Sequence, residues 1–195
     1  EYIDVGMSFR GAVSFQESTG KWIFMGTHGE PLPTRNWQFP HGRWHEEVLR
    51  RATSYQGLRG ISTWDITDPI SPKLLNEFST GETGSGTHHN YYDGGRYAYL
   101  DAGYSDQLRM ENPGRTHGNG LMIVDLSDPE NVTEVARWHV PGQLYGEETE
   151  YKKYWFAGDH AAWTGSHGAP STPMRVEEGG RYGYGGFGHF GMITF

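Results

Sequence analysis

The stretch GISTWDITDP, residues 60–69, decides the fold because its pattern returns twice along the chain. GLMIVDLSDP follows at residues 120–129, and GMITF at residues 191–195 carries the first half of the same pattern. Each copy is an apolar run opened by glycine, and in two copies an Asp and then an Asp-Pro pair close the run. Asp-Pro favours a tight turn, because proline presets φ and the Asp side chain accepts bonds from nearby N–H groups. KLLNEF at 73–78 and TEVARWHV at 133–140 are the strands predicted after these turns.

A second pattern precedes the first one in each copy. GGRYAYLDAG at 94–103 matches GGRYGYGGFG at 179–188, and TGKWIFMGTH at 19–28 matches both more loosely. A Gly-Gly or Thr-Gly step between β-prone runs is a strong hairpin signal. One unit is therefore predicted to hold four antiparallel strands, which is typical of a β-propeller blade.

These units predict an all-β fold, a single β-propeller domain or part of one over residues 1–195. Blade one covers about 11–79, blade two about 86–140, and blade three about 172–195, the last without its outermost strand. A propeller usually closes with about 4–8 blades. We therefore expect the remaining blades to lie in another segment or another chain.

The predicted blades are interrupted by long inserted loops. The repeats are spaced more widely than the about 40–50 residues common for blades, and the excess falls in three loops: 29–59, 104–119 and 141–172. Residues 43–53 in the first loop carry apolar residues at a spacing of four, which predicts one short helix docked on the propeller.

The repeat resembles that of the LVIVD-repeat family of bacterial and archaeal β-propellers. The resemblance rests on Leu121-Met122-Ile123-Val124-Asp125, on the Asp-Pro extension and on the preceding Gly-Gly-Arg-Tyr-Ala-Tyr hairpin. Trp64 and Phe195 depart from its aliphatic pattern. The resemblance implies a propeller on an exported protein, periplasmic or at the cell surface. It implies no particular reaction, because the family is defined by the blade.

Composition agrees with a strand-rich domain and excludes some partners. The 29 glycines and 14% aromatic residues suit short strands joined by tight turns. A net charge of −8 without a basic stripe argues against nucleic-acid binding. No apolar run approaches about 18 residues, so no membrane span is expected. Cysteine is absent, so no disulfide framework is available.

Candidate chemistry centres on the ten histidines, since imidazole is the commonest metal ligand and the usual general base. His88 and His89 begin the first strand of blade two, which lines the channel of a propeller. Neighbours on a strand point to opposite faces, so only one of the two is expected to face the channel. The alternative is that one of them packs between blades and bonds a backbone carbonyl.

Two further groups of candidate ligands lie on loops and hairpin ends. His160 and His167 stand in a Gly/Ala-rich loop that enters blade three. His28, Asp101 and His189 fall at the ends of the three hairpins, where an alignment of the patterns sets Asp101 level with Gly26 and Gly186. Such a ring of N and O donors predicts a divalent Zn, Fe or Mn ion.

The recurring aspartates are predicted to cap turns. Asp65 and Asp125 occupy one repeat position, and Asp68 and Asp128 another. Calcium binding is the alternative, but a proline follows each second Asp, which favours the turn.

Two classes of function remain open from the sequence. The first is a metal-capable site for a small-molecule ligand at the channel mouth, with His88, His89, His160 and His167 as candidates for catalysis if turnover occurs. The second is an exported interaction or scaffold propeller without catalysis. Propellers serve both roles, so the fold does not choose between them.

Overall fold

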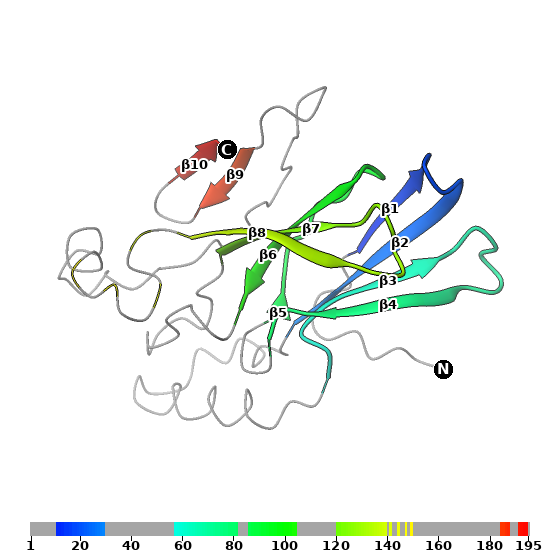
Figure 1. Ribbon diagram of the computed structural model, residues 1–195, viewed down its shortest axis with the longest axis horizontal. Helices are drawn as coiled ribbons and strands as arrows, with labels where there is room; N and C mark the ends of the chain where they lie inside the picture. The colour runs from blue at the N-terminus through cyan, green and yellow to red at the C-terminus, as the bar shows by residue number, and fades with distance from the viewer. Residues whose placement is uncertain are drawn as a thin grey trace, which may run out of the picture.

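The chain folds into β-sheets (Figure 1). A computed structural model describes residues 11–29, 57–81, 86–104 and 120–139, a few positions between 141 and 149, and the strands at 184–187 and 191–194. The named elements over these residues are all strands, so the predicted all-β class is confirmed. The helix predicted at 43–53 lies outside the described residues. Within them, no helix has the length and apolar character needed to cross a membrane.

The first sheet is a four-stranded antiparallel meander, in which each strand pairs with the next along the chain. Its strands are β1 (Gly11–Gln16), β2 (Lys21–His28), β3 (Gly60–Asp65) and β4 (Lys73–Ser79). Gly20 closes the β1–β2 hairpin with a φ of +69°, and its N–H donates to the carbonyl of Gln16. Glycine adopts this left-handed conformation without strain, which explains the Thr-Gly signal in the sequence.

The second sheet repeats this strand order with a shorter first strand. Its strands are β5 (Gly86–Thr87), β6 (Tyr97–Gly103), β7 (Gly120–Asp125) and β8 (Thr133–Trp138). Four antiparallel strands per unit are therefore confirmed for the first two copies of the repeat.

The two sheets agree down to the position of an irregularity. In the first sheet the β3–β4 register shifts between Thr63 and Trp64. In the second sheet the β7–β8 register shifts between Ile123 and Val124, the equivalent residues of the repeat. A bulge bends a strand and increases its twist. The repeated phrase thus encodes the same local bend in both sheets.

The Asp-Pro turns also recur in atomic detail. Asp65 Oδ1 accepts the N–H of Thr67, and Asp125 Oδ1 accepts the N–H of Ser127. The second aspartates act alike, since Asp68 and Asp128 accept the N–H groups of Ile70 and Glu130 through Oδ1. The prediction that these aspartates cap turns is confirmed.

The third copy contributes a two-stranded antiparallel sheet of β9 (Tyr184–Phe187) and β10 (Gly191–Thr194). Gly191 pairs with Phe187, as Gly60 pairs with His28 in the first sheet. The strand expected before this hairpin lies outside the described residues.

A single apolar core joins the two four-stranded sheets. The first sheet contributes Ile23, Met25 and Ile61, each with no exposed area. The second contributes a larger set of buried side chains: Tyr92, Ala98, Leu100, Ala102, Tyr104, Met122, Val124, Leu126 and Val132. Each large apolar side chain buried in this way stabilises the fold by about 1.5–3 kcal/mol.

Buried polar contacts set how the sheets lie against each other. The side-chain amide of Gln16 donates to the carbonyl of Leu126 at 2.7 Å and to the hydroxyl of Tyr92 at 3.0 Å. The hydroxyl of Ser14 donates to the carbonyl of Tyr92 at 3.0 Å. Because buried polar groups must be paired, these directional bonds fix one arrangement of the two sheets, whereas apolar contacts alone would allow one sheet to shift along the other.

Candidate metal site

The candidate site forms directly after β5, a strand that contacts the first sheet. Gly86 starts β5 with a φ of +78°, and a Cβ there would lie 2.5 Å from the carbonyl oxygen of His28. Only glycine allows this approach, which is reinforced by a bridge between Gly86 and Gly29. Thr87 then donates its hydroxyl to the carbonyl of Gly60. The chain that enters the site is thereby fixed to the first sheet.

An extra residue interrupts the pairing immediately after β5. Thr87 pairs with Ala102, and Tyr91 pairs with Tyr99. Three residues separate Thr87 from Tyr91, whereas two separate Ala102 from Tyr99, so the chain bends at His88 and His89. This is the geometry of a bulge, in which strict alternation of side chains does not hold.

Asp101 lies on β6 opposite this bend. Its neighbours Leu100 and Ala102 are buried in the core between the sheets, so its side chain points to the other face of the second sheet. The side chain has no exposed area. The backbone carbonyl of Asp101 accepts the N–H of His88 at 3.0 Å, which ties the bend to β6.

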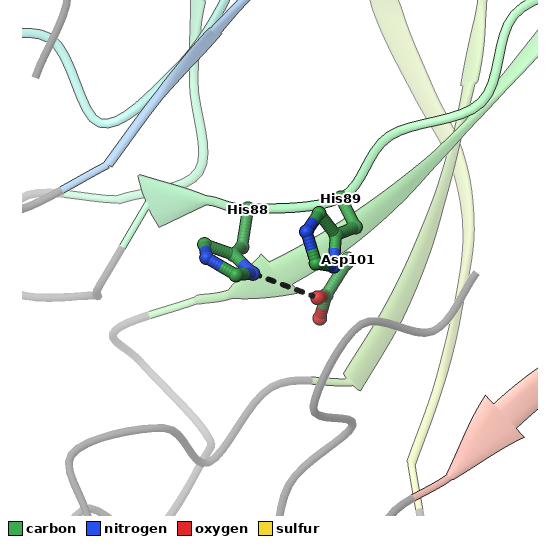
Figure 2. A group of neighbouring side chains, drawn as sticks. All are labelled: His88, His89 and Asp101. Carbon is green, nitrogen blue, oxygen red and sulfur yellow. Dashed lines mark ion pairs between the residues drawn. The ribbon is translucent and has the colours of Figure 1, made fainter. Parts of the chain in front are cut away.

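The bend brings both imidazoles to the Asp101 carboxylate (Figure 2). The ring centroids of His88 and His89 are 4.1 Å apart, and His88 Nδ1 lies 3.9 Å from Asp101 Oδ2. One ligand atom from each of the three residues lies within 4.8 Å of the others. The expectation that strand alternation separates the two histidines is wrong, because β5 ends before them.

This group could hold a metal ion, since it presents two imidazole nitrogens and one carboxylate oxygen. Zinc binds such ligands at about 2.0–2.2 Å in tetrahedral geometry, so two ligands of one ion stand about 3.4 Å apart. Ligand atoms up to 4.8 Å apart would therefore have to approach by about 1 Å, through rotation of the side chains, when the ion binds. Three protein ligands would leave coordination positions for water or another small ligand.

His28 is not part of this group. Its Nε2 lies 2.7 Å from the hydroxyl oxygen of Ser62, which also accepts the indole N–H of Trp64 at 2.9 Å. Burial lowers the pKa of His28, and the charge of Glu77 opposes that shift. His28 is thus a buried, hydrogen-bonded histidine within the first sheet.

The strand register explains why His28 and Asp101 do not meet. Asp101 pairs with Leu121, and the equivalent pair in the first sheet is Thr27 with Ile61. Asp101 is therefore level with Thr27, and the alignment that set it level with Gly26 is wrong by one residue. Of the other predicted ligands, His160, His167 and His189 lie outside the described residues.

Sequence reasoning named His88, His89 and Asp101 but placed them in two separate groups, and it missed Asn90. The Asn90 side chain contacts both sheets beside the two histidines. The only signal in the sequence was its position, directly after the His-His pair.

Comparisons with known proteins leave the family open. No family model matches the chain, and no curated protein matches it.

Proposed function

We propose that this protein binds a divalent transition metal ion, Zn, Fe or Mn, through His88, His89 and Asp101. The observation that carries the proposal is the convergence of the three side chains, with ligand atoms within 4.8 Å of one another. Mixed imidazole and carboxylate ligands suit these metals. The open coordination positions would take a small-molecule ligand, and turnover of that ligand is a separate question for experiment.

The setting of the site supports the proposal. Asp101 lies on β6 with its side chain buried, so a strand of the second sheet positions the carboxylate beside the two rings. His88 is half-buried, so its ring can be reached by an ion from solvent, whereas both ring nitrogens of His89 are buried. The proposed arrangement is a radial one, in which the two described sheets are blades of an LVIVD-like propeller and β5 is an inner strand. Export, periplasmic or to the cell surface, is proposed from the same resemblance.

Metal titration of chelator-stripped protein tests the proposal. We expect stoichiometric binding of one ion in competition with a chromophoric chelator, and a large loss of affinity in His88→Ala, His89→Ala and Asp101→Asn. Metal at 100 times its Kd should also raise the free energy of unfolding by about 2.7 kcal/mol. His139→Gln is the matched control, because His139 lies 3.3 Å from Glu147 and outside the group. Equal affinity in the control and the three variants would contradict the proposal.

A second candidate function, a scaffold that docks further sheets, is favoured by one face of the first sheet. Phe24 and Trp64 on this face are partly exposed, whereas Ala98 and Val124, their equivalents in the second sheet, are fully buried against the first sheet. Large apolar side chains around them are exposed, with Phe15 and Trp22 in ring contact at 5.5 Å. The equivalence suggests that another four-stranded sheet of the same repeat covers this face.

Molar mass measured by light scattering over a range of concentrations tests the scaffold when the further sheet comes from another chain. Phe15→Glu should abolish association, whereas Val135→Glu, an exposed apolar position on β8, should leave it intact. A wild-type protein that stays monomeric at every concentration would rule out association between copies.

A further inference from the structure

We infer that Asn90 is a positioning residue for the proposed metal site, holding His88 and His89 beside Asp101. The inference rests on the proposed function and goes beyond it, because Asn90 lies outside the ligand group. Its side chain takes the place that backbone groups of a regular β5 would occupy.

The first contact of Asn90 is with the backbone of a ligand. Its Oδ1 accepts the N–H of Asp101 at 3.2 Å. In an unbroken antiparallel pair, a carbonyl of the neighbouring strand accepts such an N–H. Because the Asn90 side chain accepts this N–H, the backbone donor of Asp101 on β6 stays hydrogen-bonded although the backbone after β5 bends away. The bend is what places both imidazoles on the side of Asp101.

The second contact of Asn90 fixes its amide to the seam between the sheets. Its Nδ2 donates to Thr27 Oγ1 at 3.1 Å and to Thr87 Oγ1 at 3.0 Å. The Thr87 hydroxyl donates its proton to the carbonyl of Gly60, so towards Asn90 it can act only as an acceptor. This fixes which end of the amide faces Asp101. The oxygen and both N–H donors of the side chain are then used.

The role differs from that of an ordinary bond between the sheets. Asn76 also joins the two sheets, since its Nδ2 donates to the carbonyl of Glu130 at 2.8 Å, but it contacts none of the three ligands. A purely structural role would make Asn90 and Asn76 alike in their effect on metal binding. A positioning role separates them, because partners that orient metal ligands usually contribute about 10–100-fold to affinity.

Metal affinity of Asn90→Ala, Asn90→Asp and Asn76→Ala, measured well below each melting temperature, tests the inference. We expect Asn90→Ala to weaken Zn²⁺ binding by about 10–100-fold. Asn90→Asp keeps an oxygen that accepts from the Asp101 N–H but loses both donors to Thr27 and Thr87, so its affinity should fall between those of the wild type and Asn90→Ala. Asn76→Ala should bind as the wild type does, whatever its melting temperature.

A second measurement applies to the metal-free protein. The 4.1 Å separation of the imidazole rings should give nuclear Overhauser effects between His88 and His89 ring protons. These effects should persist in Asn76→Ala and disappear in Asn90→Ala. Wild-type metal affinity in Asn90→Ala, with binding lost in His88→Ala, would overturn the positioning role and leave the metal site standing. If the wild type binds no metal, the proposed function fails, and ring contacts that survive in Asn90→Ala would overturn the positioning role independently.

Discussion

The hydroxyl of Thr63 donates a 2.6 Å hydrogen bond to the carbonyl oxygen of Pro129, so the first copy of the repeated phrase binds the turn of the second. Thr63 is fully buried and stands beside the bulge of β3. The bond therefore connects two features that the sequence repeats, the bulged strand and the Asp-Pro turn. Each copy supplies one part of the interface between them.

Replacing Thr63 by valine removes this hydroxyl and keeps the shape of the side chain. We expect Thr63→Val to lower the free energy of unfolding by about 1–3 kcal/mol, because the buried Pro129 carbonyl loses its donor. Denaturant unfolding measures the change. Thr67→Val is the control: Thr67 accepts the N–H of Trp22 in an exposed setting, where water replaces the lost group. Equal decreases in the free energy of unfolding in the two variants would show that the buried Thr63 bond stabilises the fold no more than the exposed Thr67 bond does.

Gln16→Leu should destabilise the same interface at its other end. The substitution leaves the Leu126 carbonyl and the Tyr92 hydroxyl without the amide that now donates to both. We expect a loss of about 2 kcal/mol in the free energy of unfolding. Thr19→Val provides the comparison, since the Thr19 hydroxyl donates to Oε1 and to the carbonyl of Gln16 from an exposed turn. A loss for Gln16→Leu no larger than for Thr19→Val would contradict a structural role for the buried amide.

The strands and turns of the two sheets could be predicted because local sequence specifies them. Gly20 and the Asp-Pro pairs act within a few residues, and their hydrogen bonds stay inside the turn. A repeated phrase then carries the same register into both sheets. The propeller arrangement depends on contacts between residues far apart in the sequence, and it stays a prediction.

The candidate site was harder to predict because it depends on a departure from regular structure. Alternation along a strand separates His88 from His89, and only the bend after Thr87 brings them together. In that bend the Asn90 side chain bonds the hydroxyl of Thr27, on the neighbouring sheet, and the hydroxyl of Thr87. A one-residue error in aligning Asp101 with Gly26 likewise arose because the patterns match only loosely in the first copy.

The hydrogen-bonded carboxylate of Asp125 predicts a contribution to acid stability. Hydrogen bonds from the Ser127 side chain and backbone, reinforced by Arg96, lower the pKa of Asp125 to about 2. Because the folded pKa lies below the unfolded value of about 3.9, this stabilisation is present above pH 4 and is lost as the pH falls toward 2. Asp125→Asn keeps an acceptor for the turn but not the charge. Unfolding at several pH values should show a wild-type advantage that closes between pH 4 and 2; a constant difference would contradict it.

The buried histidine of the first sheet predicts a dependence on pH in a higher range. Burial lowers the pKa of His28 below its ordinary value of about 6.5. The unfolded chain therefore takes up the proton more readily, so the free energy of unfolding should decline as the pH falls through 6.5. His28→Gln should remove this part of the decline. Denaturation at pH 7.5, 6.5 and 5.5 measures it.

Two neighbouring variants separate the causes of that decline. Ser62→Ala removes the hydroxyl 2.7 Å from the ring but leaves His28 enclosed by the same strands, so the decline should persist. Glu77→Gln removes the negative charge that raises the pKa of His28. The pKa of the folded protein should then fall further below that of the unfolded chain, so the decline should steepen. If Ser62→Ala abolished the decline, or Glu77→Gln made it shallower, burial could not be the dominant cause. If Ser62→Ala abolished the decline, the hydrogen bond to Ser62 would be its dominant cause.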